Sequence, residues 1–346
     1  MNDKVDVLFN EDDSLEPQRK SRKRGMWVIV NLLIVLLGIV ALVGVYGFSQ
    51  LSSFQGKSHT FEASFPSDEA KRPEATGATN ILLLGSDSRG GSGETENLPS
   101  VPNGGRADTM MLVHIPARGG KAYVMSIMRD FWVDIPAHGE AKINAALAFG
   151  GVPKVVETVE GLVGVRIDHV AGVDFEGFTN VVNALGTVTI DVPKAFNSGV
   201  KKGHHFAAGP QEMDSETALA FVRERKAFAD GDYQRVRNQQ AFMKGVFSQL
   251  ASREVLLNPS KTTETIDSLA PAITLDENLD TFTMLQLAPQ MAGVRGSDIK
   301  TFTLPNKGVG WAGQQSVVWP DYDKIKELGE AMNDNTLESW LSSQDL

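Results

Sequence analysis

The feature that most constrains this chain is an apolar stretch near the N-terminus, residues 26–48, which contains no Asp, Glu, Lys or Arg. A helix of this length is long enough to cross a hydrocarbon core of about 30 Å. A cleaved signal peptide is the alternative, but its apolar core usually has about 7–15 residues and ends at a small-residue cleavage site. Residues 47–50 (GFSQ) make a poor site of that kind. We therefore predict a retained signal-anchor.

The basic residues in 19–24 lie just before this stretch. Because positively charged flanks stay on the cytoplasmic side, we predict a cell-membrane protein with a single span, a cytoplasmic N-terminus and an extracytoplasmic catalytic part. The short tail before the span has no room for a helix-turn-helix. The net charge of −10 also argues against a general nucleic-acid binder, so no nucleic-acid partner is expected. The absence of cysteine excludes thiol nucleophiles and cysteine-bound metals.

Composition and hydrophobic pattern divide the chain into five expected segments. We predict a cytoplasmic tail (1–25), a transmembrane signal-anchor (26–48), an extracytoplasmic stalk rich in polar residues (49–78), a catalytic domain (79–320) and a C-terminal tail (321–346). Strand-like runs alternate with helical ones between residues 80 and 304, which indicates an α/β domain.

Polar clusters sit at the ends of three apolar, strand-like runs. GSDSR (85–89) follows the run 81–84, RADT (106–109) precedes the run 109–115, and SIMRD (126–130) follows the run 121–127. If neighbouring strands pair antiparallel, the end of one strand and the start of the next lie on the same edge of the sheet. Asp87, Asp108 and three arginines are then expected to meet on one rim.

A fourth polar cluster runs from Arg223 to Gln240 and contains RER (223–225), DGD (230–232) and RVRNQQ (235–240). Arg235 and Gln239 are four residues apart, so they share one face of a helix. Arginine holds phosphate oxygens bidentately, and paired carboxylates with phosphates suit Mg²⁺. The pattern therefore favours a pyrophosphate–metal site, the alternatives being ordinary surface ion pairs for the arginines and turn or helix caps for the aspartates.

At these residues the sequence resembles the LytR–CpsA–Psr family of membrane-anchored cell-wall proteins. The matching motifs stand in order behind one N-terminal span: LLLGSDSR (82–89), RADTMML (106–112), SIMRD (126–130), KINAA (142–146), VDFEGF (173–178), MDSETALAFVRERK (213–226) and DGDYQRVRNQQ (230–240). The resemblance implies a three-layer α/β sandwich with a central, mainly antiparallel sheet flanked by helices and a deep apolar pocket for a polyprenyl chain.

The resemblance also assigns roles to individual residues. It implies that Asp87 and Asp108 hold Mg²⁺ and that Arg129 acts in catalysis. Asp130, the spare carboxylate nearest Arg129, is a candidate base, with a structural ion pair as the alternative. The residues placed at the pyrophosphate are Arg106, Arg129, Lys142, Arg223, Arg225, Arg235 and Gln239.

Three functions remain open from the sequence. The first is a phosphotransferase that moves a phosphate-linked glycopolymer from a polyprenyl-pyrophosphate carrier to a muramic acid hydroxyl of peptidoglycan, as the resemblance implies. The second is a hydrolase acting on the same carrier, with water as acceptor. The third is a non-catalytic regulator that binds lipid-linked intermediates. The same residues serve the first two, because only the access of water and acceptor differs.

Overall fold

The computed structural model describes residues 44–86, 107–173, 175–228, 231–250, 252, 258–291 and 294–344. Most of the expected membrane span, 26–48, lies outside these residues. Within the described ranges, no helix has both the length and the apolar character needed to cross a membrane. Phe48–Leu346 form one compact unit, which contains the central sheet and the helices around it.

A mixed, seven-stranded sheet lies at the centre of this unit. Its strands β2, β3 and β4 pair antiparallel, with Gly85 opposite Thr109 and Met110 opposite Ile127, so the ends of β2 and β4 and the start of β3 lie at one edge of the sheet, as the sequence predicts. The outer pairs β1–β12, β7–β2 and β4–β13 are parallel. The order is β1 (His59–Thr60), β12 (Ile273–Leu275), β7 (His169–Val173), β2 (Thr79–Ser86), β3 (Ala107–Ile115), β4 (Ala122–Ile127) and β13 (Ile299–Thr303).

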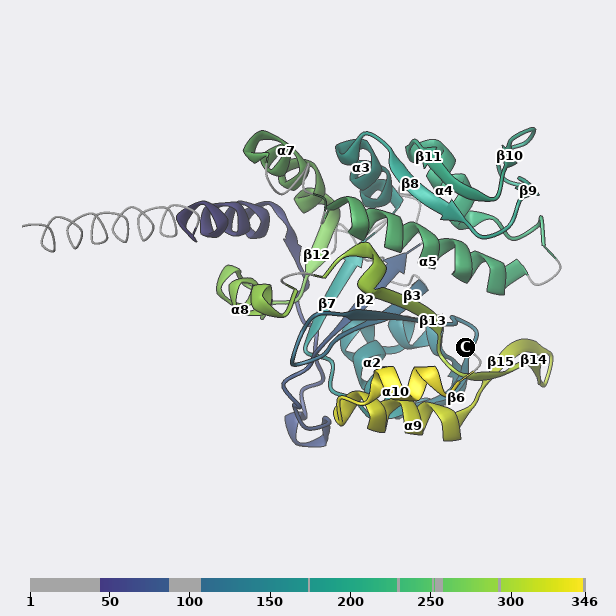
Figure 1. Cartoon of the computed structure of the whole chain (residues 1–346). Coiled ribbons are helices and arrows are strands. Elements are labelled where there is room, and N and C mark those ends of the chain that lie inside the picture. The colour runs from purple at the N-terminus through teal and green to yellow at the C-terminus, as the bar shows by residue number, and fades with distance from the viewer. Residues whose placement is uncertain are drawn as a thin grey trace, which may run out of the picture. The chain divides into compact units, whose positions relative to one another are not determined.

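Helices cover both faces of the sheet, which confirms the expected α/β architecture (Figure 1). One face carries α2 (Ala146–Val163), α9 (Tyr322–Asn333) and α10 (Leu337–Ser342). The other carries α3 (Phe175–Leu185), α4 (Ser215–Arg223), α5 (Gly231–Leu250) and α7 (Pro259–Leu269), with α8 (Thr281–Met291) near the β12 edge. Asp214 caps α4 by accepting a hydrogen bond from the backbone N–H of Thr217.

Side chains alternate between the two faces of the central sheet, so the hydrophobic core around the sheet has one part on each face. Leu82 and Leu84 of β2 belong to the cluster with α2 and α9, whereas Ile81 and Leu83 pack with the cluster on the α5 side. Successive side chains of a strand point to opposite faces, and here both faces are covered, so the runs are apolar throughout. Every residue of β4 is buried for this reason.

Four two-stranded sheets among the described residues, whose pairing the sequence did not indicate, surround this framework. They are β5 (Trp132–Ile135) with β6 (Gly139–Lys142), β8 (Val188–Val192) with β11 (Gly209–Met213), β9 (Phe196–Asn197) with β10 (His205–Phe206), and β14 (Asn306–Ala312) with β15 (Gln315–Pro320). The strands β8 to β11 form a separate apolar cluster with α4 and α5 that contains Ile190, Phe206 and Phe221.

The described structure differs from the expected boundaries at both ends of the domain. Residues after 320 were expected to form a tail, but Ile325, Leu328 and Leu337 are fully buried in the core. The expected stalk also contributes to the fold, since Phe61 is buried in the same cluster and His59–Thr60 form β1. These segments are too short to be stable alone, and their apolar residues are buried only because they pack against the sheet. The sequence pattern of the segments therefore did not identify them as part of the core.

Candidate active site

A cavity of about 450 Å³ lies between the central sheet and α5. It falls in the usual size range of ligand pockets, about 300–1,000 Å³. Ala171 and Val173 of β7 line the cavity, and their short side chains leave space between the sheet and α5. The apolar lining comprises Leu83, Leu84, Met111, Ala171, Val173 and Ile273 from the sheet and Val181, Val222, Phe242, Met243, Val246, Phe247, Leu250 and Leu269 from the helices.

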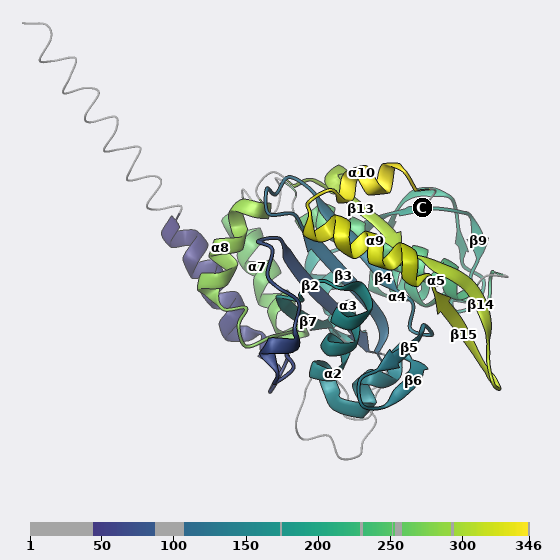
Figure 2. The ribbon, with the colours of Figure 1, turned by 90° about the horizontal axis from the view of Figure 1, so that it is seen from below.

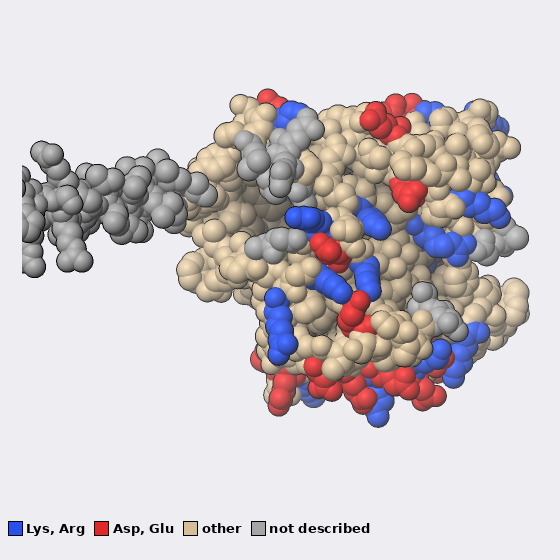
Figure 3. Space-filling model, viewed as in Figure 1, with Lys and Arg blue, Asp and Glu red and all other residues tan. Residues whose placement is uncertain are grey.

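Four arginines and one glutamine also line this cavity. They are Arg129, Arg223, Arg225, Arg235 and Gln239, all predicted from the sequence. The chain as a whole is acidic, and Asp and Glu gather along the edge formed by α9 and α10 (Figure 3). An arginine cluster in this setting is a local site for an anion rather than part of a basic surface.

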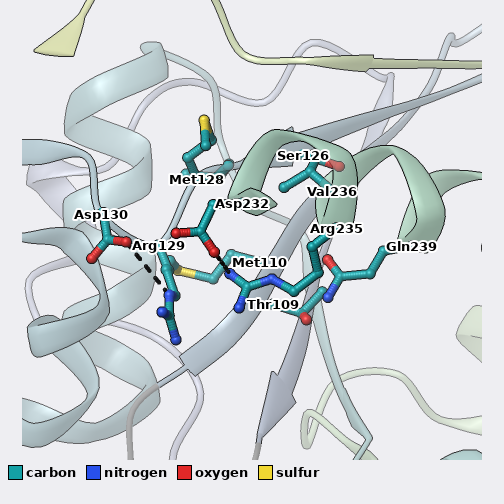
Figure 4. A pocket seen from close by; sticks show the side chains of 11 residues that line it. Thr109, Met110, Ser126, Met128, Arg129, Asp130, Asp232, Arg235, Val236 and Gln239 are labelled. Atoms are coloured by element: carbon teal, nitrogen blue, oxygen red, sulfur yellow. Dashed lines mark ion pairs between the residues drawn. The ribbon is translucent and has the colours of Figure 1, made fainter. Parts of the chain in front are cut away.

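A smaller hollow adjoins the cavity and shares Thr109, Arg129, Arg235 and Gln239 with it (Figure 4). Asp130 and Asp232 also line this hollow. Gly85 stands opposite Thr109 in the sheet, and a Cβ at this glycine would lie 2.9 Å from the Cβ of Thr109. Glycine therefore allows the ends of β2 and β3 to approach closely at the cavity.

Asp232, in the first turn of α5, is the counterion of two site arginines. Its Oδ1 lies 2.9 Å from Nε of Arg225 and 3.2 Å from a terminal nitrogen of Arg235. A shared carboxylate reduces the repulsion between the two guanidinium groups and fixes their positions. The sequence did not single out Asp232 as a site residue, and the only signal was its place in the DGD run before α5.

Arg129 follows β4 and is joined to Asp130 and Lys142 in an ion-pair cluster. Oδ1 of Asp130 lies 2.9 Å from Nζ of Lys142, and Oδ2 lies 3.5 Å from Nε of Arg129. Both carboxylate oxygens thus face cations, which favours the structural ion pair over a role as base. Lys142 lines neither cavity and reaches the site through Asp130.

Glu224 stands between Arg223 and Arg225 in the sequence, and its side chain is fully buried in the structure. Its Oε2 accepts hydrogen bonds from the Ser198 hydroxyl at 2.9 Å and from the Gly199 N–H at 2.7 Å. Its Oε1 accepts from the backbone N–H groups of Arg225 and Ala227, each at 3.1 Å. Burial opposes ionisation, but the hydrogen bonds outweigh it, and the net pKa of Glu224 is lowered.

This carboxylate fastens the segment after Arg223 to the loop at 198–200. Sequence reasoning missed it, because a glutamate between two arginines looks like a solvated charge.

Three predicted site residues are not described. Asp87 and Arg106 lie outside the described residues, as does the side chain of Asp108. The adjoining backbone is described, and Ser86 pairs with Ala107 at the end of the sheet where the cavity opens. Within the described residues there is no group of three or more His, Asp or Glu that could hold a metal ion.

Comparison with known proteins gives matches over most of the chain. The model of the LytR_cpsA_psr family matches residues 45–334. The chain is 34% identical over 282 residues to the probable cell wall biosynthesis protein LcpB of Corynebacterium glutamicum, covering 80% of this chain and 64% of the relative. The cell wall biosynthesis protein LcpA of the same organism is 28% identical, covering 74% and 57%. The matches thus span less than two thirds of these two relatives.

A further relative is TagU of Bacillus anthracis, a polyisoprenyl-teichoic acid–peptidoglycan teichoic acid transferase. It is 32% identical over 232 residues, covering 65% of this chain and 71% of TagU.

Solved structures share the fold. The crystal structure of Bacillus subtilis TagV gives a TM-score of 0.62 at 23% identity, covering 76% of this chain and 98% of TagV. A LytR-Csp2A-Psr enzyme from Actinomyces oris gives 0.61 at 20% identity, covering 80% and 96%. A structure of TagT bound to LIIa-WTA gives 0.59 at 23% identity, covering 80% and 100%.

Proposed function

The chain belongs to the LytR_cpsA_psr family, and from this premise we propose that it is a membrane-anchored phosphotransferase of cell-wall assembly. It moves a phosphate-linked glycopolymer from a polyprenyl-pyrophosphate carrier to a muramic acid hydroxyl of peptidoglycan. The observation that carries the proposal is the apolar cavity of about 450 Å³ whose lining includes four arginines and Gln239.

The two parts of this cavity match the two parts of the carrier. A prenyl chain gains about 0.8 kcal/mol for each methylene group removed from water, so the apolar lining formed by the sheet and α5 holds the tail. The pyrophosphate lies among Arg129, Arg223, Arg225 and Arg235, whose guanidinium groups stay charged at every physiological pH. Gln239 offers an amide hydrogen bond beside them.

The reaction needs positioning and charge stabilisation rather than a covalent intermediate with the protein. The acceptor hydroxyl oxygen forms a bond to the phosphorus attached to the sugar and its proton passes to water, while the bond from that phosphorus to the bridging oxygen breaks and polyprenyl phosphate leaves. The arginines stabilise the charge that develops on the bridging oxygen. Asp232 holds Arg225 and Arg235 in place for this task.

We further propose that Asp87 and Asp108 hold Mg²⁺ at the same rim. The pairing of Ser86 with Ala107 supports this, because it joins the strand end before Asp87 to the strand start that contains Asp108. Two carboxylates together with phosphate oxygens are a donor set that suits Mg²⁺. When bound, the ion would neutralise phosphate charge.

The test uses the full chain in detergent with a short prenyl-pyrophosphate-linked sugar, Mg²⁺ and peptidoglycan fragments, with products analysed by mass. Arg129→Ala is the site variant. Arg118→Ala is its matched control, because Arg118 is an exposed arginine in the turn between β3 and β4, at the opposite end of β4. We expect a sugar-phosphate–peptidoglycan adduct from the wild type and Arg118→Ala, and none from Arg129→Ala.

Two other results would contradict the proposal. Free sugar phosphate without adduct would identify a hydrolase. Neither product, with donor binding retained in Arg129→Ala, would leave a protein that only binds lipid-linked intermediates.

A further inference from the structure

The hairpin β14–β15 carries the most exposed tryptophan of the described residues. It projects from the body of the unit in both views of the ribbon (Figures 1 and 2). Trp311 is 70% exposed and Val309 is 64% exposed, and Trp319 on the second strand is 37% exposed. Large apolar side chains grouped on a projecting element mark a contact surface for a partner molecule.

Two hydrogen bonds join the base of this hairpin to the candidate site. The N–H of Val318 donates to the carbonyl oxygen of Asp130 at 2.8 Å. The hydroxyl of Tyr233 donates to Oδ1 of Asn306 at 2.7 Å. Asp130 adjoins Arg129, and Tyr233 adjoins Asp232, so the hairpin is anchored to the two segments that carry site charges. It therefore stands beside the cavity rather than at a remote surface.

Packing inside the hairpin leaves the Trp311 face open. Trp319 lies against Gly310, where a Cβ would collide with its indole ring. Trp311 is paired with Ser316 and Val309 with Val318, so Val309 and Trp311 point to the face opposite Trp319. The burial of Val318 in the main core holds the base of this open face in position.

The chemistry of the hairpin suits an uncharged sugar ring. No charged residue occurs between Gly308 and Pro320. Ser316 is paired with Trp311 and shares its face, and Gln314 lies in the adjoining turn. The negative face of an aromatic ring attracts the C–H groups on the flat side of a pyranose, and amides and hydroxyls bind its hydroxyl groups. A phosphate-containing polymer would call for lysine or arginine instead, and the hairpin tip has none.

We propose that the β14–β15 hairpin is an acceptor subsite, in which Trp311 stacks on a sugar ring of the uncharged backbone of a peptidoglycan glycan strand. This rests on the proposed function and deepens it: the hairpin holds the strand while one of its hydroxyls reaches the donor phosphorus at the arginines. Trp311 is thus a specificity residue for the acceptor and takes no part in binding the donor.

The test measures how the full chain in detergent binds muramidase-solubilised peptidoglycan fragments. We expect Trp311→Ala to weaken binding about three- to tenfold, the size of a lost aromatic contact, and Trp311→Phe to retain most of it. Phe282→Ala is the matched control, because Phe282 is an aromatic residue of α8 that is 65% exposed. It should bind like the wild type. In the transfer assay, Trp311→Ala should raise the acceptor KM by the same factor and leave kcat and the donor KM unchanged.

The outcomes separate this inference from the proposed function. If the wild type forms the adduct and Trp311→Ala has an unchanged acceptor KM, the subsite is wrong and the transferase stands. If no adduct forms but fragments bind and Trp311→Ala loses that binding, the subsite stands without the transferase. If Trp311→Ala instead alters self-association or binding to phospholipid vesicles and leaves fragment binding intact, the hairpin contacts a second copy or a membrane, and the proposal is overturned.

Discussion

At the scale of single residues, the carboxylate of Glu224 is expected to position the arginines on either side of it. Glu224→Gln keeps the shape but replaces one acceptor oxygen with an NH₂ group, so at least two of the N–H or O–H groups that now donate to it lose their acceptor. We expect unfolding to become easier by about 1–3 kcal/mol, the cost of unsatisfied buried donors. Transfer activity should fall further than this loss of folded protein explains, because the segment carrying Arg225 is loosened. Urea unfolding and the transfer assay measure both effects.

Glu216→Gln is the control for this prediction. Glu216 is exposed and lies 3.3 Å from Lys201, a surface pair of small energetic value. The free energy of unfolding of Glu216→Gln should differ from that of the wild type by less than about 0.5 kcal/mol. Equal behaviour of the two variants would mean that the buried carboxylate does not organise the site.

The buried side chain of His114 is expected to reduce stability in acid. The Asn80 amide donates to the carbonyl oxygen of Arg166, so its Oδ1 must accept from Nδ1 of His114 at 2.8 Å. Nε2 of His114 is buried with no hydrogen-bond partner, and burial lowers the pKa of His114 from 6.5 to about 4. His114 therefore binds a proton below about pH 6.5 in the unfolded chain, but only below about pH 4 in the folded chain.

The folded state should thus lose roughly 3 kcal/mol from this group as the pH falls from 6.5 to 4. His114→Asn retains a donor to Asn80 but has no titrating ring, so its stability should fall less steeply over this interval, whatever its stability at pH 7. His138→Asn, at an exposed histidine, should keep the wild-type slope. Urea midpoints at several pH values test this, and parallel curves for His114→Asn and the wild type would refute it.

At the scale of the elements, the space between the sheet and α5 should accept a larger side chain. Ala171 of β7 lines the cavity, whereas Ala122 of β4 is packed in the core on the same side of the sheet. Ala171→Phe should change stability by less than about 1 kcal/mol, while Ala122→Phe should lose about 1–3 kcal/mol through overpacking. Ala171→Phe should also weaken binding of a prenyl pyrophosphate at least about tenfold, while the affinity of Ala122→Phe for it, measured on folded protein, stays within about twofold. A strongly destabilised Ala171→Phe would mean that the cavity is closed in solution.

The helices and strands also differ in how well the sequence predicts them. Strands β2, β3 and β4 were predictable because they are buried on both faces and therefore read as continuous apolar runs, and antiparallel pairing then placed Arg129 on the rim. The hairpin β14–β15 was not predictable, since glycines alternate with its apolar residues and glycine is depleted in strands. The spacing of Asp232 and Arg235 on one helix is visible in the sequence, but the contact of Asp232 with Arg225 is not. The role of Glu224 depends on contacts with the loop at 198–200, which sequence spacing does not encode either.

At the scale of the whole molecule, the distribution of charge favours binding of anionic ligands at the cavity. The chain has a net charge of −10, yet four arginines line one cavity. Exposed charges beyond a Debye length of about 8 Å are screened at physiological salt, so the acidic surface does not cancel the attraction of the nearby arginines for a pyrophosphate. The acidic surface instead disfavours unspecific contacts with anionic polymers, so we expect a phosphate group to bind at the cavity.

The orientation of the whole chain in the membrane should follow from the charges that flank its apolar stretch. Basic residues precede the stretch at 26–48, so residues 1–25 should remain in the cytoplasm and the folded unit should lie outside. Because the chain has no cysteine, Ser14→Cys and Ser343→Cys each introduce a single thiol. In intact cells from which the outer wall has been removed, a membrane-impermeant maleimide should label Ser343→Cys and not Ser14→Cys, and both should react after lysis. Labelling of Ser14→Cys before lysis would reverse the orientation and place the arginine cavity on the wrong side of the membrane for peptidoglycan.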